Sequence, residues 1–225
     1  LVGSEMCIRD RYKSMCGIVA GVTGRDVVPV FLQGLRRLEY RGYDSCGVAV
    51  VRDGEIDRAR SVARVKDLAE QVRAEGMHGT VGIAHTRWAT HGGPVVANAH
   101  PHIAGNRIAL VHNGIIENFA QLRAELEATG VTMQSQTDTE VLAHLVNFYL
   151  EDDLLEALKK ALSRVTGAYA VAVFDKRHPE RIVGARQGSP MVVGLGEGEN
   201  FIASDAMADS YTHLRAHETR RHLVC

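Results

Sequence analysis

The chain has 225 residues, of which 45% are hydrophobic and 24% are charged, and its formal net charge is −1. This size fits one globular domain with a sizeable core, and near-neutral charge gives no electrostatic footprint for nucleic acid or anionic lipid. No apolar run reaches the length of a membrane span, so we expect a cytoplasmic protein with no nucleic-acid or membrane partner. The cysteines lack metal-ligand spacing and no disulfide framework is needed at this size, so we expect no metal site. They are Cys7, Cys16, Cys46 and Cys225.

In chain order the sequence predicts a strand at 16–22, a helix at 27–42, strands at 46–51 and 55–62, a helix at 65–76, strands at 80–89 and 107–116, helices at 118–130, 137–150 and 152–167, and strands at 168–175, 181–187, 190–196 and 200–205. Gly42 is expected to end the first helix, and Asp53-Gly54 to form a hairpin turn. Strands in groups and helices in groups, without βαβα alternation, favour an α+β fold with sheets stacked between helix layers.

The two ends of the chain are related as sense and antisense. A DNA encoding the nine residues from Leu1 to Arg9 can be written so that its opposite strand encodes Ser210 to Glu218, in phase. Unrelated protein segments would almost never show this, so we expect both ends to be adaptor-like artefact, to be set aside as tags are. The alternative is a native disordered tail at each end. The expected organisation is residues 1–14 and 209–225 as artefact, and residues 15–208 as one domain truncated at its C-terminus.

Polar side chains gather mainly where predicted strands end. The segment HTRWATHGGP, residues 85–94, brings cations, hydroxyls, an indole and two glycines into one loop, and Asn113-Gly114 interrupts an apolar run. Each residue also has a structural interpretation: a turn for Asn113-Gly114, packing for Trp88, and a helix N-cap for Thr137 or Asp138. Four histidines are as readily structural as catalytic, namely His85, His100, His102 and His112.

The residues that accompany Cys16 make chemical sense as a set. A terminal cysteine carries both a thiol and an α-amino group of pKa about 7.7–8.0, so the amine can act as base without a histidine. Asn113 and the Gly114 N–H can supply two donors to a developing oxyanion. Arg87 suits a carboxylate and Asp138 suits an ammonium group. Together they predict a pocket in which the side-chain carbonyl of an amino acid meets a thiol.

Eight motifs carry a resemblance to a known family. They are MCGIVAG, RRLEYRGYDSCG, GIAHTRWATHG, NAHPH, VHNGIIEN, SQTDTEV, GAYAV and GENFIASD, and they cover nearly all of residues 16–205 in the expected order. The chain resembles the glutaminase domains of the class II glutamine amidotransferases. LEYRGYDS and HTRWATHG make it most similar to those of the isomerizing glutamine–fructose-6-phosphate aminotransferases.

The resemblance implies an N-terminal-nucleophile hydrolase fold, a four-layer αββα sandwich, with no metal or organic cofactor. It implies that Met15 is removed and that the Cys16 thiol attacks the carboxamide of L-glutamine, releasing ammonia and leaving a thioester that water cleaves to glutamate. Asn113 and Gly114 match the oxyanion hole, which makes the catalytic set Cys16, Asn113 and Gly114. The implied substrate-binding set is Arg87, Trp88, Thr90, His91, Asp138 and Arg41.

Within the substrate-binding set the resemblance gives separate roles. Arg87 clamps the α-carboxylate, with Thr90 and His91 in the same loop, and Asp138 pairs with the α-amino group. Trp88 closes the site and gates ammonia transfer, and Arg41 lies in a segment that orders near the nucleophile. Cys46 is expected to be a buried hydrophobe.

Two departures from the family pattern matter. Residues 1–14 block the α-amino group of Cys16, so the chain as written is expected to be inactive. The sugar-phosphate isomerase domains, which would use fructose 6-phosphate to make glucosamine 6-phosphate in a homo-oligomeric enzyme, are absent. Two alternatives stay open, the amidotransferase half of another class II enzyme and a catalytically silent glutamine-binding module.

Overall fold

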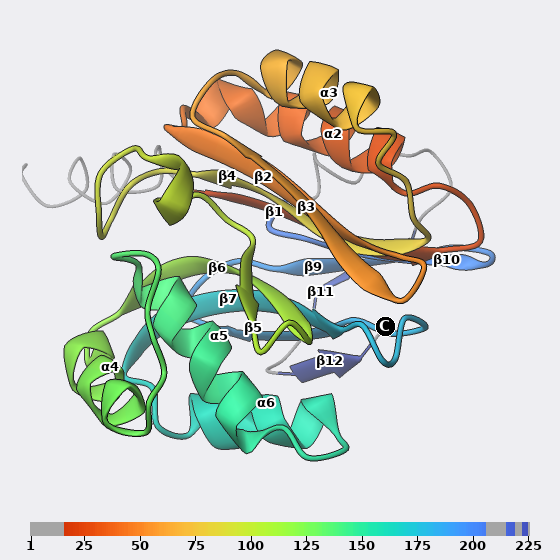
Figure 1. Cartoon of the computed structure of the whole chain (residues 1–225). Helices are drawn as coiled ribbons and strands as arrows, with labels where there is room; N and C mark the ends of the chain where they lie inside the picture. Colours follow the sequence, from red (N-terminus) through yellow and green to blue (C-terminus); the bar gives the residue numbers. More distant parts are fainter. Residues whose placement is uncertain (1–15, 206–214, 219–221, 225) are drawn as a thin grey trace, which may run out of the picture.

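Two helices, two antiparallel sheets and a second group of helices are stacked as four layers (Figure 1). The computed structural model describes residues 16–205, 215–218 and 222–224, and for Arg41 and the last two ranges it describes the backbone alone. The αββα sandwich expected from the sequence is confirmed. Residues 1–14, expected to be artefact, lie outside the described residues, as do most of residues 206–225.

The structure contains every helix and strand that the sequence predicts, in the predicted order, together with elements that it does not predict. The observed elements are β1 (Gly17–Thr23), α2 (Val28–Leu38), the 3-10 helix η1 (Glu39–Arg41), β2 (Ser45–Arg52), β3 (Glu55–Ser61), α3 (Val65–Ala74), β4 (Val81–Arg87), the 3-10 helix η2 (Val96–Asn98), β5 (His102–Ala104), β6 (Ile108–Ile116), α4 (Phe119–Ala128), α5 (Asp138–Tyr149), α6 (Leu154–Leu162), β7 (Gly167–Asp175), β8 (Val183–Gln187), β9 (Val192–Leu195), β10 (Glu199–Ala203), β11 (Arg215–Glu218) and β12 (His222–Val224).

The strands form two antiparallel sheets whose inner faces pack against each other. One has the order β11-β9-β10-β1-β4-β2-β3 and the other β12-β8-β7-β6-β5. β1 therefore lies inside the first sheet, between β10 and β4, and β6 lies inside the second. β11 and β12 fall in the segment expected to be artefact. Their pairing with β9 and β8 says nothing of the segment's origin, which stays a prediction.

Local sequence accounts for the helix boundaries. α2 has Pro29 in its first turn and buries Val28, Phe31, Leu35 and Leu38, the i, i+3, i+7 and i+10 spacing of one helical face. It ends before the predicted Gly42, because residues 39–41 tighten into a 3-10 turn that Gly42 terminates at a φ of +79°.

The largest departures from the predicted elements occur in short segments. Helix α6 ends at Leu162 rather than 167, because Gly167 already belongs to β7. Strand β5, three residues long, was not predicted, since its pattern is too short to show a period. The Asp53-Gly54 turn is confirmed, with φ of 52° and 77°, the positive values that a two-residue hairpin requires.

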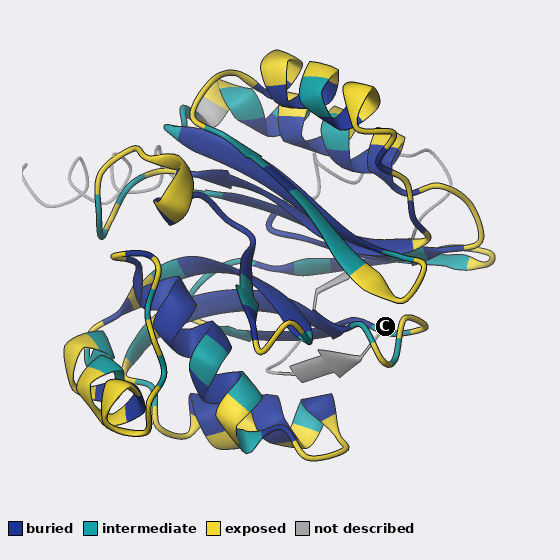
Figure 2. Ribbon diagram, in the orientation of Figure 1, coloured by how far each residue is buried: buried dark blue, intermediate teal, exposed yellow. Residues whose placement is uncertain are grey.

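Apolar side chains fill the three spaces between the four layers. The space between the sheets holds Ile18 and Ile83 from one sheet and Val111 and Phe174 from the other, all without solvent exposure. Helices α2 and α3 cover the outer face of the first sheet, and α4, α5 and α6 cover that of the second (Figure 1). Most exposed residues accordingly lie on outer helix faces and in loops (Figure 2). Within the described residues no helix is long and apolar enough to cross a membrane.

Candidate active site

Cys16 lies at the start of β1, beside the end of β4. Gly17 pairs with Thr86 across the two strands, and its N–H donates to the Thr86 hydroxyl at 3.1 Å. This register brings the partly exposed Cys16 side chain against Trp88. The Trp88 N–H donates to Sγ at 3.1 Å, and Sγ lies 3.6 Å from the Trp88 carbonyl oxygen.

The environment of the Cys16 thiol favours its neutral form. Burial raises the pKa of the thiol, against the opposing effects of the Trp88 backbone and the Arg87 charge. Among the described residues the hydrogen bonds of the thiol go to the Trp88 backbone, and none goes to a histidine. At neutral pH the thiol therefore needs a base before it can act as a nucleophile.

Asn113 reaches Cys16 from the second sheet. Its Nδ2 donates to the Cys16 carbonyl oxygen at 2.8 Å, so one amide links β6 to the start of β1. The alternative interpretation of Asn113-Gly114 as a turn is wrong, because both residues lie inside β6 and pair with β7. Gly114 has a φ of +132°, and a Cβ at this position would lie 2.0 Å from the Ala168 carbonyl oxygen. Close packing of the two strands therefore requires glycine here.

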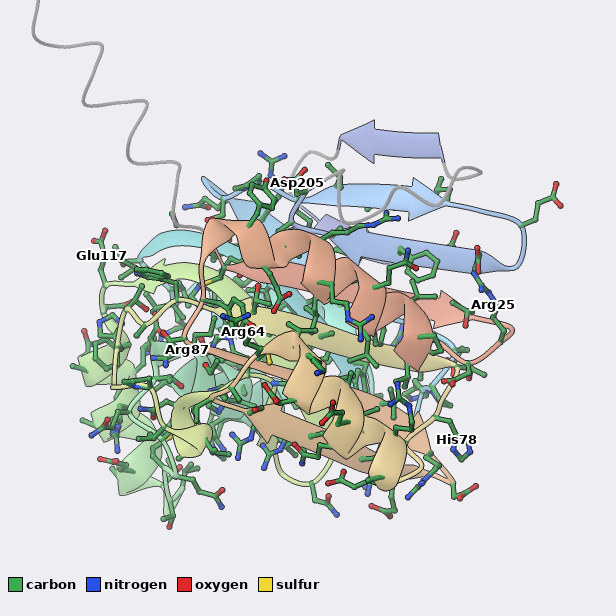
Figure 3. All side chains as sticks on the ribbon, turned by 90° about the horizontal axis from the view of Figure 1, so that it is seen from above. Arg25, Arg64, His78, Arg87, Glu117 and Asp205 are labelled. Atoms are coloured by element: carbon green, nitrogen blue, oxygen red, sulfur yellow. The ribbon has the colours of Figure 1, made fainter. Side chains whose placement is uncertain are left out.

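Arg87, the last residue of β4, is only 3% exposed and anchors the loop that follows it. Its Nη1 donates to Asp44 at 3.2 Å and to the Gly93 carbonyl at 3.3 Å. Its Nη2 donates to the carbonyls of His91 and Gly92. The guanidinium thus fastens the loop from inside, toward the end of the molecule opposite Arg25 and His78 (Figure 3).

Asp44 holds the other side of this loop. Its carboxylate accepts from the Ala89 N–H as well as from Arg87, so residues on both sides of Trp88 are fixed. The Trp88 side chain is 45% exposed and its ring faces Gly42, where a Cβ would lie 2.9 Å from Cζ3. Thr90 is also exposed. The side chain of Arg41 lies outside the described residues, so its expected role stays a prediction.

Asp138 is a buried carboxylate at the first position of α5. The N-cap is Thr137, whose hydroxyl accepts from the Glu140 N–H, so of the two N-cap candidates Thr137 takes that role. Asp138 instead accepts from the Ile116 N–H at 2.9 Å and lies 3.7 Å from His91 Nδ1. Its negative charge faces the pocket rather than the helix end.

Most of these residues, though not Asn113 or Asp44, line one small pocket. It is lined by Cys16, Arg87, Trp88, Thr90, His91, His100, His112, Gly114, Thr137, Asp138 and Thr139. Its free space is about 10 Å³, roughly enough for one water molecule. Four lining residues are not among the predicted site residues, namely His100, His112, Thr137 and Thr139, although His100 stands in the NAHPH motif.

A family model described as a glutamine amidotransferase domain matches residues 85–208. The chain belongs to this glutamine amidotransferase family. It is 59% identical over 199 residues to glutamine–fructose-6-phosphate aminotransferase (isomerizing) of Bordetella pertussis, covering 86% of this chain and 33% of that protein. The protein of the same name from Xylella fastidiosa is 54% identical over 196 residues, covering 86% and 32%. The chain thus spans about a third of the length of the curated relatives it matches.

Solved glutamine amidotransferases share the fold of this domain. Glutamine phosphoribosylpyrophosphate amidotransferase from B. subtilis superposes with a TM-score of 0.79 at 27% identity, covering 93% of this chain and 47% of that one. A structure described as the allosteric regulatory enzyme of purine biosynthesis gives 0.81 at 27% identity, covering 93% and 46%.

A cluster of buried histidines supports the site of this amidotransferase domain. Ring centroids lie 4.2 Å apart for His85 and His100 and 5.0 Å apart for His100 and His102. Burial lowers the pKa of His85 to about 3, and lowers those of His100, His102 and His112 as well. Within the described residues no group of three or more His, Cys, Asp or Glu side chains is arranged to hold a metal ion.

We expect this amidotransferase domain to lose stability as the pH falls below about 6.5. The histidines are neutral when folded but take up protons when unfolded, so stability is full above their ordinary pKa and declines between about 6.5 and 3. His85 alone is expected to remove about 2 kcal/mol between pH 7 and pH 5. Urea unfolding at the two pH values measures the loss. An unchanged free energy of unfolding would contradict the neutral state of the cluster.

Proposed function

We propose that this domain hydrolyses L-glutamine to glutamate and ammonia, with Cys16 as the nucleophile and its α-amino group as the base. The observation that carries the proposal is that Cys16 and Gly114, from different sheets, line one pocket with Arg87 and Asp138. Beside this pocket the Asn113 amide donates to the Cys16 carbonyl. Thiol, oxyanion donor, cation and carboxylate are the four groups that this reaction requires.

Cys16 needs a base because burial raises the pKa of its thiol. The nearby histidines suit this role poorly, because their pKa values are lowered and His85 and His100 hydrogen bond to each other. An α-amino group of pKa about 7.7–8.0 is partly neutral near physiological pH and lies on the same residue as the thiol. It takes the thiol proton and returns it to the departing nitrogen.

The reaction proceeds in two acyl transfers. Sγ forms a bond to the carboxamide carbon, the C–N bond breaks, and ammonia leaves with the proton from the amine. Water then adds to the thioester carbon and displaces the thiolate, giving glutamate. In both steps a second N–H of Asn113 Nδ2, beyond the one bound to the Cys16 carbonyl, and the Gly114 N–H stabilise the oxyanion.

The pocket has to widen before it holds glutamine, because its free space is about that of one water molecule. Trp88 and Thr90 are the exposed part of its wall, so movement of residues 88–93 admits the substrate. The same movement frees Arg87 from the loop carbonyls for the substrate α-carboxylate. Asp138 receives the α-amino group.

In the whole protein we propose that the released ammonia converts fructose 6-phosphate to glucosamine 6-phosphate. The chain is 59% identical to a glutamine–fructose-6-phosphate aminotransferase but only 27% identical to the glutamine phosphoribosylpyrophosphate amidotransferase from B. subtilis. This difference favours fructose 6-phosphate over phosphoribosylpyrophosphate as the acceptor of the ammonia. The sugar-phosphate reaction would belong to domains beyond this chain. We further propose a cytoplasmic, homo-oligomeric enzyme whose natural sequence excludes residues 1–14 and 209–225.

The test compares two purified proteins, the chain as printed and a form that begins at Met15, with removal of Met15 checked by intact mass. Glutamate release from L-glutamine is expected only in the second, because residues 1–15 turn the Cys16 amine into a peptide nitrogen. Activity in the printed form with residues 1–15 still attached would overturn the amine as base. Two folded, inactive proteins would overturn the glutaminase assignment.

Replacing Asp138 by asparagine is expected to raise KM for glutamine about 10- to 100-fold, because the ammonium group loses a charged partner. Asparagine can still accept from the Ile116 N–H, so the fold is kept. Steady-state kinetics measure the change. Asp153→Asn is the control, since it removes a carboxylate that caps α6 outside the pocket. An unchanged KM in Asp138→Asn would remove Asp138 from the binding set.

A further inference from the structure

The Asn113 side chain is held from both ends. Its Nδ2 lies 2.8 Å from the Cys16 carbonyl oxygen, and its Oδ1 lies 2.9 Å from His85 Nε2. We propose that His85 and His100 are positioning residues, a proposal that rests on the proposed function. Through a series of hydrogen bonds with one fixed direction, they keep the N–H groups of Asn113 directed toward Cys16.

The donor-to-acceptor direction of these hydrogen bonds follows from the Cys16 carbonyl. A carbonyl oxygen only accepts, so the Asn113 atom that faces it must be the donor, Nδ2. The Asn113 oxygen then faces His85 Nε2, which must carry the hydrogen. A neutral imidazole carries one N–H, so His85 Nδ1 is left with a lone pair and has to accept.

His100 supplies the donor that His85 requires. Its Nδ1 lies 3.0 Å from His85 Nδ1 and 3.3 Å from His85 Nε2. Since His85 Nε2 already donates to Asn113, the acceptor is Nδ1, and His100 Nδ1 carries the hydrogen. The remaining nitrogen, His100 Nε2, is buried and has no hydrogen-bond partner in the described part of the chain. A lone pair there is less unfavourable than an unpaired buried N–H.

The surroundings keep both rings neutral. An imidazolium at His85 would carry a hydrogen on Nδ1, which would face the hydrogen on His100 Nδ1, and one at His100 would leave a buried N–H at Nε2 without a partner in the described part of the chain. Arg87, His102 and His112 lie near the pair and disfavour a further positive charge, and burial lowers the pKa of both rings. One arrangement of hydrogens therefore satisfies the three contacts that join the Cys16 carbonyl, Asn113, His85 and His100. The His112 backbone is a further hydrogen-bond partner of the His85 ring.

The catalytic consequence concerns the orientation of one amide. If His85 carried its hydrogen on Nδ1, Asn113 would face two acceptors, His85 Nε2 and the Cys16 carbonyl, with a single NH2 group. Rotation of the amide would then place Oδ1 beside Cys16, where an oxyanion would meet a lone pair instead of a donor. His100 prevents this indirectly, by fixing the tautomer of His85.

Nitrogen-15 NMR of the full chain tests the hydrogen positions without any need for activity. Two-bond correlations should show His85 with its proton on Nε2 and His100 with its proton on Nδ1, each assigned by loss of its signal in His85→Gln or His100→Gln. The His100 result discriminates, because an unconstrained neutral imidazole favours the Nε2 proton. His100 with its proton on Nε2, or His85 with its proton on Nδ1, would overturn the proposed series of hydrogen bonds.

Kinetics of the form that begins at Cys16 test the consequence. His85→Leu and His100→Leu should lower kcat for glutamine hydrolysis by about 10- to 100-fold. This fall should not exceed the fall in kcat that follows removal of an oxyanion donor. His85→Gln should recover most of the rate, since its amide can donate to Asn113 Oδ1. Alkylation of Cys16 by iodoacetamide should keep its rate in all variants, because that displacement builds no oxyanion.

His102→Leu is the matched control. It removes a buried imidazole that contacts His100 and bonds Thr137 at 3.0 Å, but none of the hydrogen bonds leading to Asn113. It should lower the midpoint of thermal unfolding and leave kcat unchanged. An equal fall of kcat in His102→Leu, or a fall of alkylation matching that of hydrolysis in His85→Leu, would show a general structural effect and overturn the proposal. An inactive parent protein would instead overturn the proposed function.

Discussion

Replacing Cys16 by alanine abolishes glutamate release in the form that begins at this residue, an expected fall of roughly 10⁴-fold or more. The thiol is the atom that forms the thioester, and no other sulfur lies in the pocket among the described residues. Alanine also leaves the α-amino group in place, so the variant separates nucleophile from base. Coupled detection of glutamate measures the loss, and intact mass confirms that the new N-terminus is exposed.

Cys46 provides the control for this variant. It is also a free cysteine, but it is buried in β2 and burial raises the pKa of its thiol to about 12, as expected of a cysteine that only packs. Cys46→Ala should keep the rate of hydrolysis. Residual hydrolysis by Cys16→Ala at more than about a hundredth of the parent rate would contradict covalent catalysis by this thiol.

The sequence predicted the order of the elements because most of them are long enough to show a period. Strands β1, β2 and β7 are apolar except at their ends, and the buried residues of α2 recur at three and four residues. The strand predicted at 107–116 is confirmed as β6 and includes Asn113-Gly114. The dipeptide typically marks a turn, yet the tertiary pairing of β6 with β7 extends the strand through it.

The family resemblance names seven of the eleven residues that line the pocket, but not the contacts that hold them in place. Local pattern carries no information on which residue of β4 faces Cys16, since the pairing of Gly17 with Thr86 joins segments 69 residues apart. The full engagement of Arg87 by Asp44 and the following loop likewise depends on tertiary structure. The histidine chain depends on side-chain geometry across both sheets, which a single sequence does not encode in any short motif.

The distorted backbone at Gly114 carries the second large prediction. An ideal Cβ at this position would lie 2.0 Å from the Ala168 oxygen and 2.8 Å from the Ala168 carbonyl carbon, both of them backbone atoms of β7. Real Cβ atoms do not approach so closely, and the φ of +132° is one that residues other than glycine rarely adopt. An added methyl group therefore has to push β6 away from β7.

Gly114→Ala is expected to lower the free energy of unfolding by about 2–5 kcal/mol, the combined effect of strain and overpacking. Because the Gly114 N–H is one proposed oxyanion donor, its displacement should also lower kcat by about 10²- to 10³-fold. Urea unfolding and glutamate release measure the two effects. Iodoacetamide labelling of Cys16 checks that the pocket is still assembled.

Gly24→Ala is the control, because a Cβ there meets only the Gly198 oxygen, at 4.0 Å, and lies outside the pocket. Gly24→Ala should leave the free energy of unfolding and kcat close to those of the parent protein. If Gly114→Ala were destabilised but hydrolysed glutamine at the parent rate, the strand pairing would need the glycine and the oxyanion hole would not. The proposed catalytic role would then rest on Asn113 alone, whose orientation the His85 and His100 variants measure independently.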